Sequence, residues 1–184
     1  MNLEKAIKIA VEAHTGQVDK GGNPYILHPL RVMLSLDTEE ERIVGILHDV
    51  VEDCAPENYK WDRENFTHFY KLSKIRQPEK NTWEYLISEG LNERLFEALQ
   101  SVSKSPKEEA DFQDLKHNGS EEALRQHYIA FINRALENEI GRKVKLKDID
   151  DNLDISRIAN PTKNDNRRLR RYNEARSILA HETE

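Results

Sequence analysis

Cysteine, glycine and proline are all scarce in this chain of 184 residues. The single cysteine, Cys54, cannot form an internal disulfide or a cysteine-rich zinc site, so any metal ion must be held by histidine, aspartate or glutamate. The 7 glycines and 6 prolines form no repeated hairpin signals, which argues against a β-sandwich or β-barrel and favours an all-α fold. A chain of this length predicts one domain that spans residues 1–184.

Long apolar runs and an excess of positive charge are also absent. No apolar stretch approaches the length of a membrane span, and the first residues lack the apolar core of a signal peptide, so we expect a cytoplasmic protein. The net charge of -6 argues against binding to nucleic acid or to a membrane surface. It is compatible with one basic pocket for a phosphorylated small molecule. The sequence makes no prediction about the oligomeric state.

One stretch, residues 43–53, combines an apolar stripe with four titratable side chains. At 3.6 residues per turn, the titratable groups crowd one face beside the stripe; they are His48, Asp49, Glu52 and Asp53. Charged groups on a half-buried helix cost free energy unless they are compensated, and a divalent cation compensates an imidazole beside carboxylates. We therefore interpret His48 and Asp49 as metal ligands. Glu52 and Asp53 are interpreted as the acid/base pair beside them.

Apolar periodicity predicts helices along most of the chain. The first runs from Leu3 to His14, and the capping pair Thr38 and Glu41 predicts that the titratable helix starts near Glu39. Further helices are expected over residues 66–73, 83–87, 91–102, 121–140 and 144–158 and at the C-terminal end. The polar segment 103–119 is the best candidate for a mobile insertion.

Three polar residues near the N terminus have a structural and a functional interpretation. His28 precedes Pro29, which favours the first turn of a helix, so its ring can point across a cleft; beside His48 and Asp49 we interpret it as a ligand. His14 lies almost in line with an apolar stripe and is interpreted as a hydrogen-bonded structural histidine. Lys20 stands in a glycine-rich turn that is able to cover a ligand, which alone is weak evidence.

The segment 144–154 is the second one rich in acids. Asp148 and Asn152 are four residues apart, so their side chains share one face of the predicted helix. A metal site begun by two histidines and Asp49 still lacks a ligand, and Asp148 is able to supply it. Four acids within seven residues are also typical of a solvated helix face, which is the favoured interpretation when this segment is taken alone, so both interpretations stay open at this point.

Several of these motifs resemble one family when they are taken in order. They are Ala13-His14-Thr15-Gly16-Gln17, Lys20, Pro24-Tyr25, His28-Pro29, the run from Ile46 to Asp53, Lys145-Leu146, Asp148 and Asn152. Together they resemble the HD-domain hydrolases of the alarmone (p)ppGpp, which are the hydrolase halves of the bifunctional Rel/SpoT proteins and the stand-alone small alarmone hydrolases. The resemblance extends over nearly the whole chain.

This resemblance implies an all-α HD-domain helical bundle and a nucleotide substrate, with pyrophosphate and a nucleoside di- or triphosphate as products. It implies one manganese ion, Mn²⁺, whose ligands are His28, His48, Asp49 and Asp148. It also implies that Glu52 and Asp53 act on the water at the metal, and that Lys20 and Asn152 contact the nucleotide.

The chain departs from the family pattern at two places. Asp19 stands where the family has an arginine that stacks on guanine, so we hypothesise a guanine preference that is weaker or shifted toward adenine. The run Asp150-Asp151 replaces one that is often basic or histidine-containing.

Two other functions stay open, namely hydrolysis of another nucleotide and a non-catalytic nucleotide-binding HD scaffold. The arginines of 167–171 are interpreted as a solvated face, with contact to substrate phosphates as the alternative.

Overall fold

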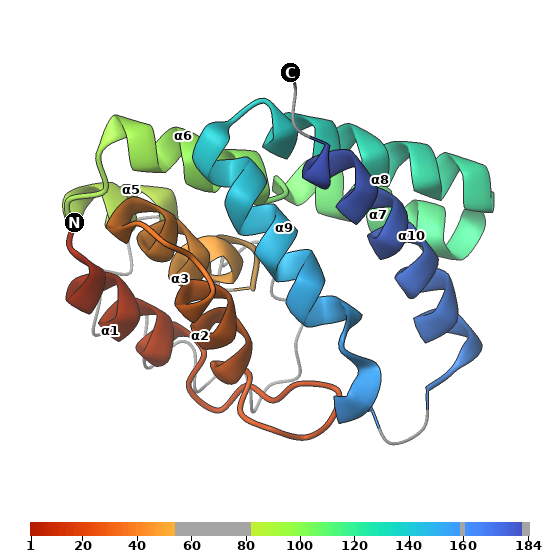
Figure 1. Cartoon of the computed structure of the whole chain (residues 1–184), viewed down its shortest axis with the longest axis horizontal. Coiled ribbons are helices and arrows are strands. Elements are labelled where there is room, and N and C mark those ends of the chain that lie inside the picture. Colours follow the sequence, from red (N-terminus) through yellow and green to blue (C-terminus); the bar gives the residue numbers. More distant parts are fainter. Residues whose placement is uncertain (54–81, 159–160, 182–184) are drawn as a thin grey trace.

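The computed structural model describes residues 1–53, 82–158 and 161–181, and within these ranges every regular element is a helix (Figure 1). The α-helices are α1 (Leu3–Ala13), α2 (Leu27–Leu34), α3 (Glu39–Asp53), α5 (Thr82–Ser88), α6 (Glu93–Val102), α7 (Pro106–Asn118), α8 (Glu121–Leu136), α9 (Glu139–Leu153) and α10 (Lys163–Ala180). A short 3-10 helix, Ile155–Arg157, follows α9. The predicted all-α fold class is confirmed.

Helix α3 is the element on which the N-terminal helices assemble. It packs against α1, α2, α6 and α9, and residues such as Val44, Ile46 and Leu47 on it are fully buried. In Figure 1, α9 runs through the centre, between α1 to α3 on one side and α7, α8 and α10 on the other. A second apolar cluster joins α8, α9 and α10 around Ile132, Ile149 and Leu179. Helix α9 therefore borders both cores.

The start of α3 is set by the capping pair that the sequence predicted. The Glu41 backbone N–H donates to Thr38 Oγ1 at 3.2 Å, and the Thr38 N–H donates to Glu41 Oε2 at 3.1 Å. Lys143 of α9 donates to the other oxygen of this buried carboxylate at 2.8 Å. The cap therefore also ties α3 to α9.

A close approach at Gly45 brings the end of α2 onto α3. A Cβ at this position would lie 2.5 Å from Cδ1 of Leu36, which is itself only 3% exposed. Such a contact is shorter than van der Waals packing allows, so a larger residue at this position would force the buried Leu36 side chain to move.

The predicted helix over 121–140 is wrong in one respect, because the structure divides it into α8 and α9. The Asn138 side chain accepts from the Gly141 N–H at 2.8 Å and caps a new helix. The helix predicted over 144–158 ends as an α-helix at Leu153. Segment 103–119 contains α7, which opens with a capping box between Ser105 and Glu108; its mobility stays a prediction.

The helix predicted over 66–73 lies outside the described residues. Among the helices that the structure does describe, none combines the length and the apolar character needed to cross a membrane.

Candidate metal centre

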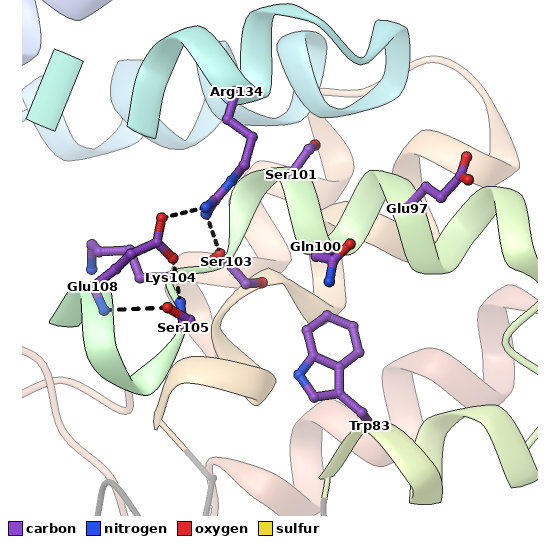
Figure 2. Close-up of a pocket in the computed structure, with 9 residues that line it drawn as sticks. All are labelled: Trp83, Glu97, Gln100, Ser101, Ser103, Lys104, Ser105, Glu108 and Arg134. Carbon is purple, nitrogen blue, oxygen red and sulfur yellow. Dashed lines mark hydrogen bonds and ion pairs between the residues drawn. The ribbon is translucent and has the colours of Figure 1, made fainter. Parts of the chain in front are cut away.

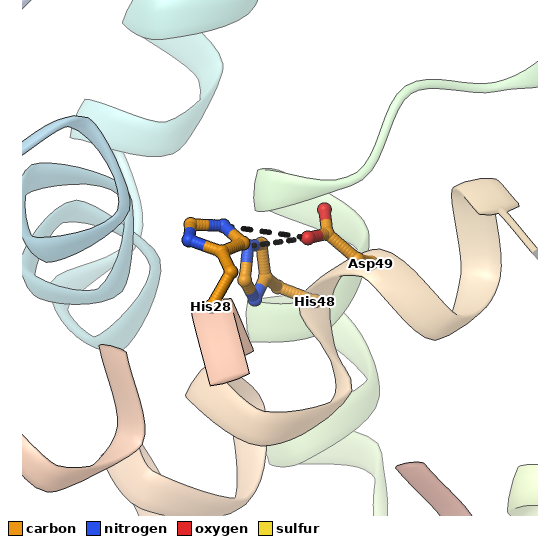
Figure 3. A group of neighbouring side chains, drawn as sticks. All are labelled: His28, His48 and Asp49. Carbon is orange, nitrogen blue, oxygen red and sulfur yellow. Dashed lines mark ion pairs between the residues drawn. The ribbon is translucent and has the colours of Figure 1, made fainter. Parts of the chain in front are cut away.

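Three predicted ligands from two helices meet at one place (Figure 3). His28 comes from the first turn of α2, whereas His48 and Asp49 come from the C-terminal half of α3. Asp49 Oδ2 lies 3.5 Å from His28 Nε2 and 3.2 Å from His48 Nε2. One ligand atom from each of the three residues lies within 4.8 Å of the others.

Asp148 reaches the same place from α9. Its Oδ1 lies 3.2 Å from His28 Nε2 and 3.6 Å from His48 Nε2. Its side chain is buried, so it does not form the solvated helix face that the acidic run left open. The four predicted ligands therefore offer two imidazole nitrogens and two carboxylate oxygens from three helices.

The donor atoms suit a divalent cation. Two ligand atoms bound about 2.1 Å from one ion and about 90° apart are about 3 Å from each other, which is close to the separations here. His48 Nδ1 donates to the carbonyl of Gly45 at 2.7 Å, and a carbonyl only accepts, so the proton is on Nδ1. His48 Nε2 is buried and has no hydrogen-bond partner among the described residues. A metal ion would satisfy this nitrogen.

The charges at the centre favour exchange of a proton for a cation. Burial alone would lower the pKa of His28, but hydrogen bonds to Asp148 and Asp151 and the charge of Asp49 raise it to about 10. Burial would raise the pKa of Asp148, but the Lys145 ammonium and a hydrogen bond to His28 hold it well below the usual range. Without a metal, His28 therefore carries the positive charge that the carboxylates require.

Two side chains of α9 hold Asp148 in place. Lys145 donates from Nζ to Asp148 Oδ2 at 2.7 Å and lies 4.8 Å from the centre of the Phe131 ring. Asn152, predicted to contact the nucleotide, donates from Nδ2 to Asp148 Oδ1 at 2.6 Å and to its carbonyl at 3.1 Å. In this structure the Asn152 side chain therefore supports Asp148, one of the predicted metal ligands.

Tyr25 supports Asp49 in the same way. Its hydroxyl donates to Asp49 Oδ2 at 2.6 Å, and its ring packs against His14 and His28 with centroid separations of 5.1 and 5.9 Å. His14 is buried, and its Nδ1 lies 2.8 Å from Gln17 Oε1. This geometry fits the interpretation of His14 as a hydrogen-bonded structural histidine.

Glu52 is held by a residue that follows α6. Lys104 donates to Glu52 Oε1 from its backbone N–H at 2.7 Å and to Oε2 from Nζ at 2.8 Å. The same Nζ donates to Glu109 of α7 at 2.8 Å. Asp53 is the last residue of α3, and its side chain lies outside the part of the chain that is described.

A cavity of about 290 Å³ lies beside this lysine, between α5, α6, α7 and α8 (Figure 2). Lys104, Trp83 and Arg134 are among its lining residues. Arg134 donates to the Ser103 carbonyl at 2.6 Å and also pairs with Glu108. The lining includes none of the four predicted ligands, so we do not assign the cavity to the metal centre.

The glycine-rich turn places Lys20 against the start of α10. Lys20 Nζ lies 3.0 Å from Asp165 Oδ1, and the lysine side chain is 61% exposed. Asp19 Oδ1 accepts the backbone N–H groups of Gly21 and Asn23 at 2.8 and 2.9 Å. The Asp19 carboxylate therefore stabilises the turn itself.

The arginine run on α10 is partly a solvated face. Arg167 is 59% exposed and pairs with Glu121 at 3.0 Å, and Arg170 is exposed as well. Arg168 instead packs over the ring of Tyr172, at 5.7 Å from its centre, and is 22% exposed.

Three side chains that contact the predicted ligands or Glu52 from distant positions in the chain had no predicted role. These are Tyr25, Lys104 and Asp151, whose partners lie 24, 52 and 123 positions away. Helical spacing relates only residues three or four apart, so it carried no signal for them. Tyr25 belongs to the Pro24-Tyr25 motif of the resemblance, and this motif was the signal available for it.

Comparison with known proteins gives short but clear matches. No protein-family model matches the chain. A 3'-pyrophosphohydrolase of guanosine-3',5'-bis(diphosphate) from Borreliella burgdorferi is 45% identical over 60 residues, which is 30% of this chain and 9% of that protein. A protein of the same name from Vibrio cholerae is 38% identical over 56 residues, 28% of this chain and 8% of that protein. A putative chloroplastic GTP diphosphokinase from Arabidopsis thaliana is 46% identical over 55 residues, 28% of this chain and 6% of that protein.

These matches bear out the resemblance to the Rel/SpoT-type proteins. The matched segments make up less than a tenth of each relative, so the relatives are much longer than the part they share with this chain.

Proposed function

We propose that the chain is a metal-dependent phosphohydrolase that removes the 3'-pyrophosphate from an alarmone such as (p)ppGpp or (p)ppApp. The products would be pyrophosphate and a nucleoside di- or triphosphate. The convergence of two imidazole nitrogens and two carboxylate oxygens from α2, α3 and α9 carries this proposal. The names of the Borreliella and Vibrio relatives support the choice of reaction. A cytoplasmic location stays a prediction from the sequence.

The proposed cofactor is one Mn²⁺ ion held by His28, His48, Asp49 and Asp148. A set of two nitrogen and two oxygen donors leaves coordination positions free on an ion that prefers six ligands. When bound, the ion would supply Lewis-acid activation of water and would neutralise charge on the attacked phosphate. Tyr25, Lys145 and Asn152 hold the two carboxylates in place for it.

Glu52 and Asp53 are the proposed acid/base pair. Both oxygens of Glu52 accept from Lys104, so this carboxylate has a fixed direction and suits the role of orienting a water molecule. A carboxylate has lone pairs left for one further donor. Asp53 is the second proposed member of the pair, and either carboxylate is able to accept the proton of the water molecule.

Lys20 and Asn152 are the proposed contacts to the nucleotide. Lys20 is exposed and pairs with Asp165, so a substrate phosphate would compete with one carboxylate for its ammonium group. Asp19 uses one carboxylate oxygen on the backbone of its own turn and brings no cation to stack on a base. This supports the hypothesis that guanine selectivity is weaker or shifted toward adenine.

The test is an assay of pyrophosphate release from ppGpp, ppApp and a panel of other nucleotides. We expect release from the two alarmones with added Mn²⁺, its loss with a chelator, and a loss of more than about 100-fold in His48→Ala. His117→Ala on the exposed face of α7 is the matched control.

Three results would contradict parts of the proposal. Turnover of another nucleotide alone would favour a different HD phosphohydrolase, and nucleotide binding without turnover would favour a scaffold. A strong preference for ppGpp over ppApp would defeat the hypothesis on base selectivity.

A further inference from the structure

We propose that Asp151 and Arg31 are positioning residues that orient His28 for metal binding and so set the metal affinity of the centre. This inference rests on the proposed metal site and concerns two residues that the proposed reaction does not use. The observations behind it are the contacts of His28 Nδ1, the ring nitrogen that faces away from Asp49.

Asp151 fixes the proton of the His28 ring. Asp151 Oδ2 lies 2.7 Å from His28 Nδ1, and both side chains are largely buried, with 13% and 8% exposed. An ionised carboxylate only accepts hydrogen bonds, so Nδ1 carries the proton. The ring therefore presents Nε2 to the centre, where Asp148 Oδ1 lies 3.2 Å away. A ligand histidine whose other nitrogen donates to a carboxylate is held in one tautomer and one orientation.

Arg31 fixes Asp151 in turn. Its Nε lies 2.5 Å from Asp151 Oδ1, and its Nη2 donates to Oδ2 at 3.0 Å. A bidentate pair of this kind fixes the plane of the carboxylate as well as its position. It also balances the charge of Asp151. Asp151 can therefore orient the histidine without adding a further net negative charge to the centre.

The arrangement also explains why α2 and α9 meet at this point. Arg31 is one helical turn after His28 on α2, and Asp151 is one turn after Asp148 on α9. One carboxylate of α9 therefore faces each nitrogen of the His28 ring: Asp148 faces Nε2, and Asp151 faces Nδ1. The ring lies between two successive turns of α9.

The test compares Mn²⁺ binding to the metal-stripped full chain and to its variants, measured by electron paramagnetic resonance of the free ion. We expect Asp151→Ala to weaken binding by about 10- to 100-fold. Asp151→Asn keeps an acceptor oxygen and should recover most of the affinity. Arg31→Met should weaken binding less than Asp151→Ala, because Asp151 remains present.

The matched control is Asp150→Ala, the preceding residue of α9. Asp150 pairs with Arg176 at 2.6 Å on an exposed surface, and its loss should leave the affinity unchanged.

The outcomes separate this inference from the proposed function. Equal Mn²⁺ affinity in Asp151→Ala and wild type, with normal pyrophosphate release, would overturn the inference and leave the function standing. A wild-type chain that binds Mn²⁺ but hydrolyses no nucleotide would overturn the function, and the affinity ratios would still decide the inference. Absence of Mn²⁺ binding in the wild type would overturn both.

Discussion

The two histidines of the candidate metal centre are oriented by the same kind of hydrogen bond. Each donates from Nδ1 to an oxygen that can only accept, which is the Gly45 carbonyl for His48 and the Asp151 carboxylate for His28. Each therefore offers Nε2 to the centre. The difference is that Gly45 is part of the same helix, whereas Asp151 belongs to α9, so the orientation of His28 depends on tertiary packing.

Metal affinity should rise with pH. In the metal-free protein the pKa of His28 is raised to about 10, so a cation must displace a proton from this ring at neutral pH. We expect the association constant for Mn²⁺ to increase at least about tenfold per pH unit between about pH 6 and pH 8. Calorimetry in two buffers of different ionisation enthalpy would count the protons released. An affinity independent of pH would show that His28 is already neutral before the metal binds.

Lys104 should affect catalysis more than metal binding. It contacts Glu52 and not the four ligands, so Lys104→Met leaves the carboxylate with one donor and a freer orientation. We expect kcat to fall by about tenfold, since positioned acid/base groups contribute about 10²–10⁴-fold. The Mn²⁺ affinity should stay the same. Lys107→Met, an exposed lysine of α7, is the control. An unchanged kcat would mean that Lys104 does not orient Glu52 for catalysis.

The sequence predicted the candidate ligands better than their supports. His48, Asp49 and Glu52 lie on one helix, where the 3.6-residue period relates them. His28 and Asp148 were added because the ligand set begun on that helix was incomplete. Contacts such as Tyr25 to Asp49 or Lys104 to Glu52 join residues whose distance in the chain carries no geometric information. They depend on how the helices cross.

Glycine at position 45 of α3 leaves space for the buried Leu36 side chain. Alanine would favour the helix by about 1 kcal/mol relative to glycine, but its Cβ would meet Leu36 Cδ1 at 2.5 Å in a buried place. Overpacking of a core costs about 1–3 kcal/mol, so we expect Gly45→Ala to lower the free energy of unfolding by about 1 kcal/mol. Urea denaturation measures this change.

Gly45→Ala in a Leu36→Ala background tests whether the contact with Leu36 causes the loss of stability. With the leucine removed, the added methyl group has space, and Gly45→Ala should be neutral or stabilising. An equal loss of stability in both backgrounds would mean that the contact with Leu36 is not the cause.

Helix boundaries were predictable where the signal was local. Thr38 and Glu41 are three residues apart and cap each other, so the start of α3 was visible in the sequence. The break between α8 and α9 was missed because apolar residues continue across it, with Ala135 before and Ile140 after, both buried. Asn138, which caps α9, was the available signal.

At the scale of the whole molecule, the centre joins α2, α3 and α9, which also share one apolar core. An ion that binds only the folded chain stabilises it by about 2.7 kcal/mol at a concentration of 100 times Kd. For a domain of this size, we expect Tm to rise by about 5–10 °C. Thermal denaturation with and without Mn²⁺ measures this, and Asp148→Asn should remove most of the shift.

The stabilisation by Mn²⁺ should depend on pH, because the metal-free and the metal-bound fold respond differently to pH. The protonated His28 ring stabilises the metal-free fold fully below its unfolded pKa of 6.5, and that contribution is lost as pH rises toward about 10. The metal-bound fold has no such proton on Nε2, so this ring does not lower its stability as the pH rises above 6.5. The Tm difference between the two forms should therefore widen from pH 6.5 to pH 8. A difference that narrows would mean that the cation binds somewhere other than His28.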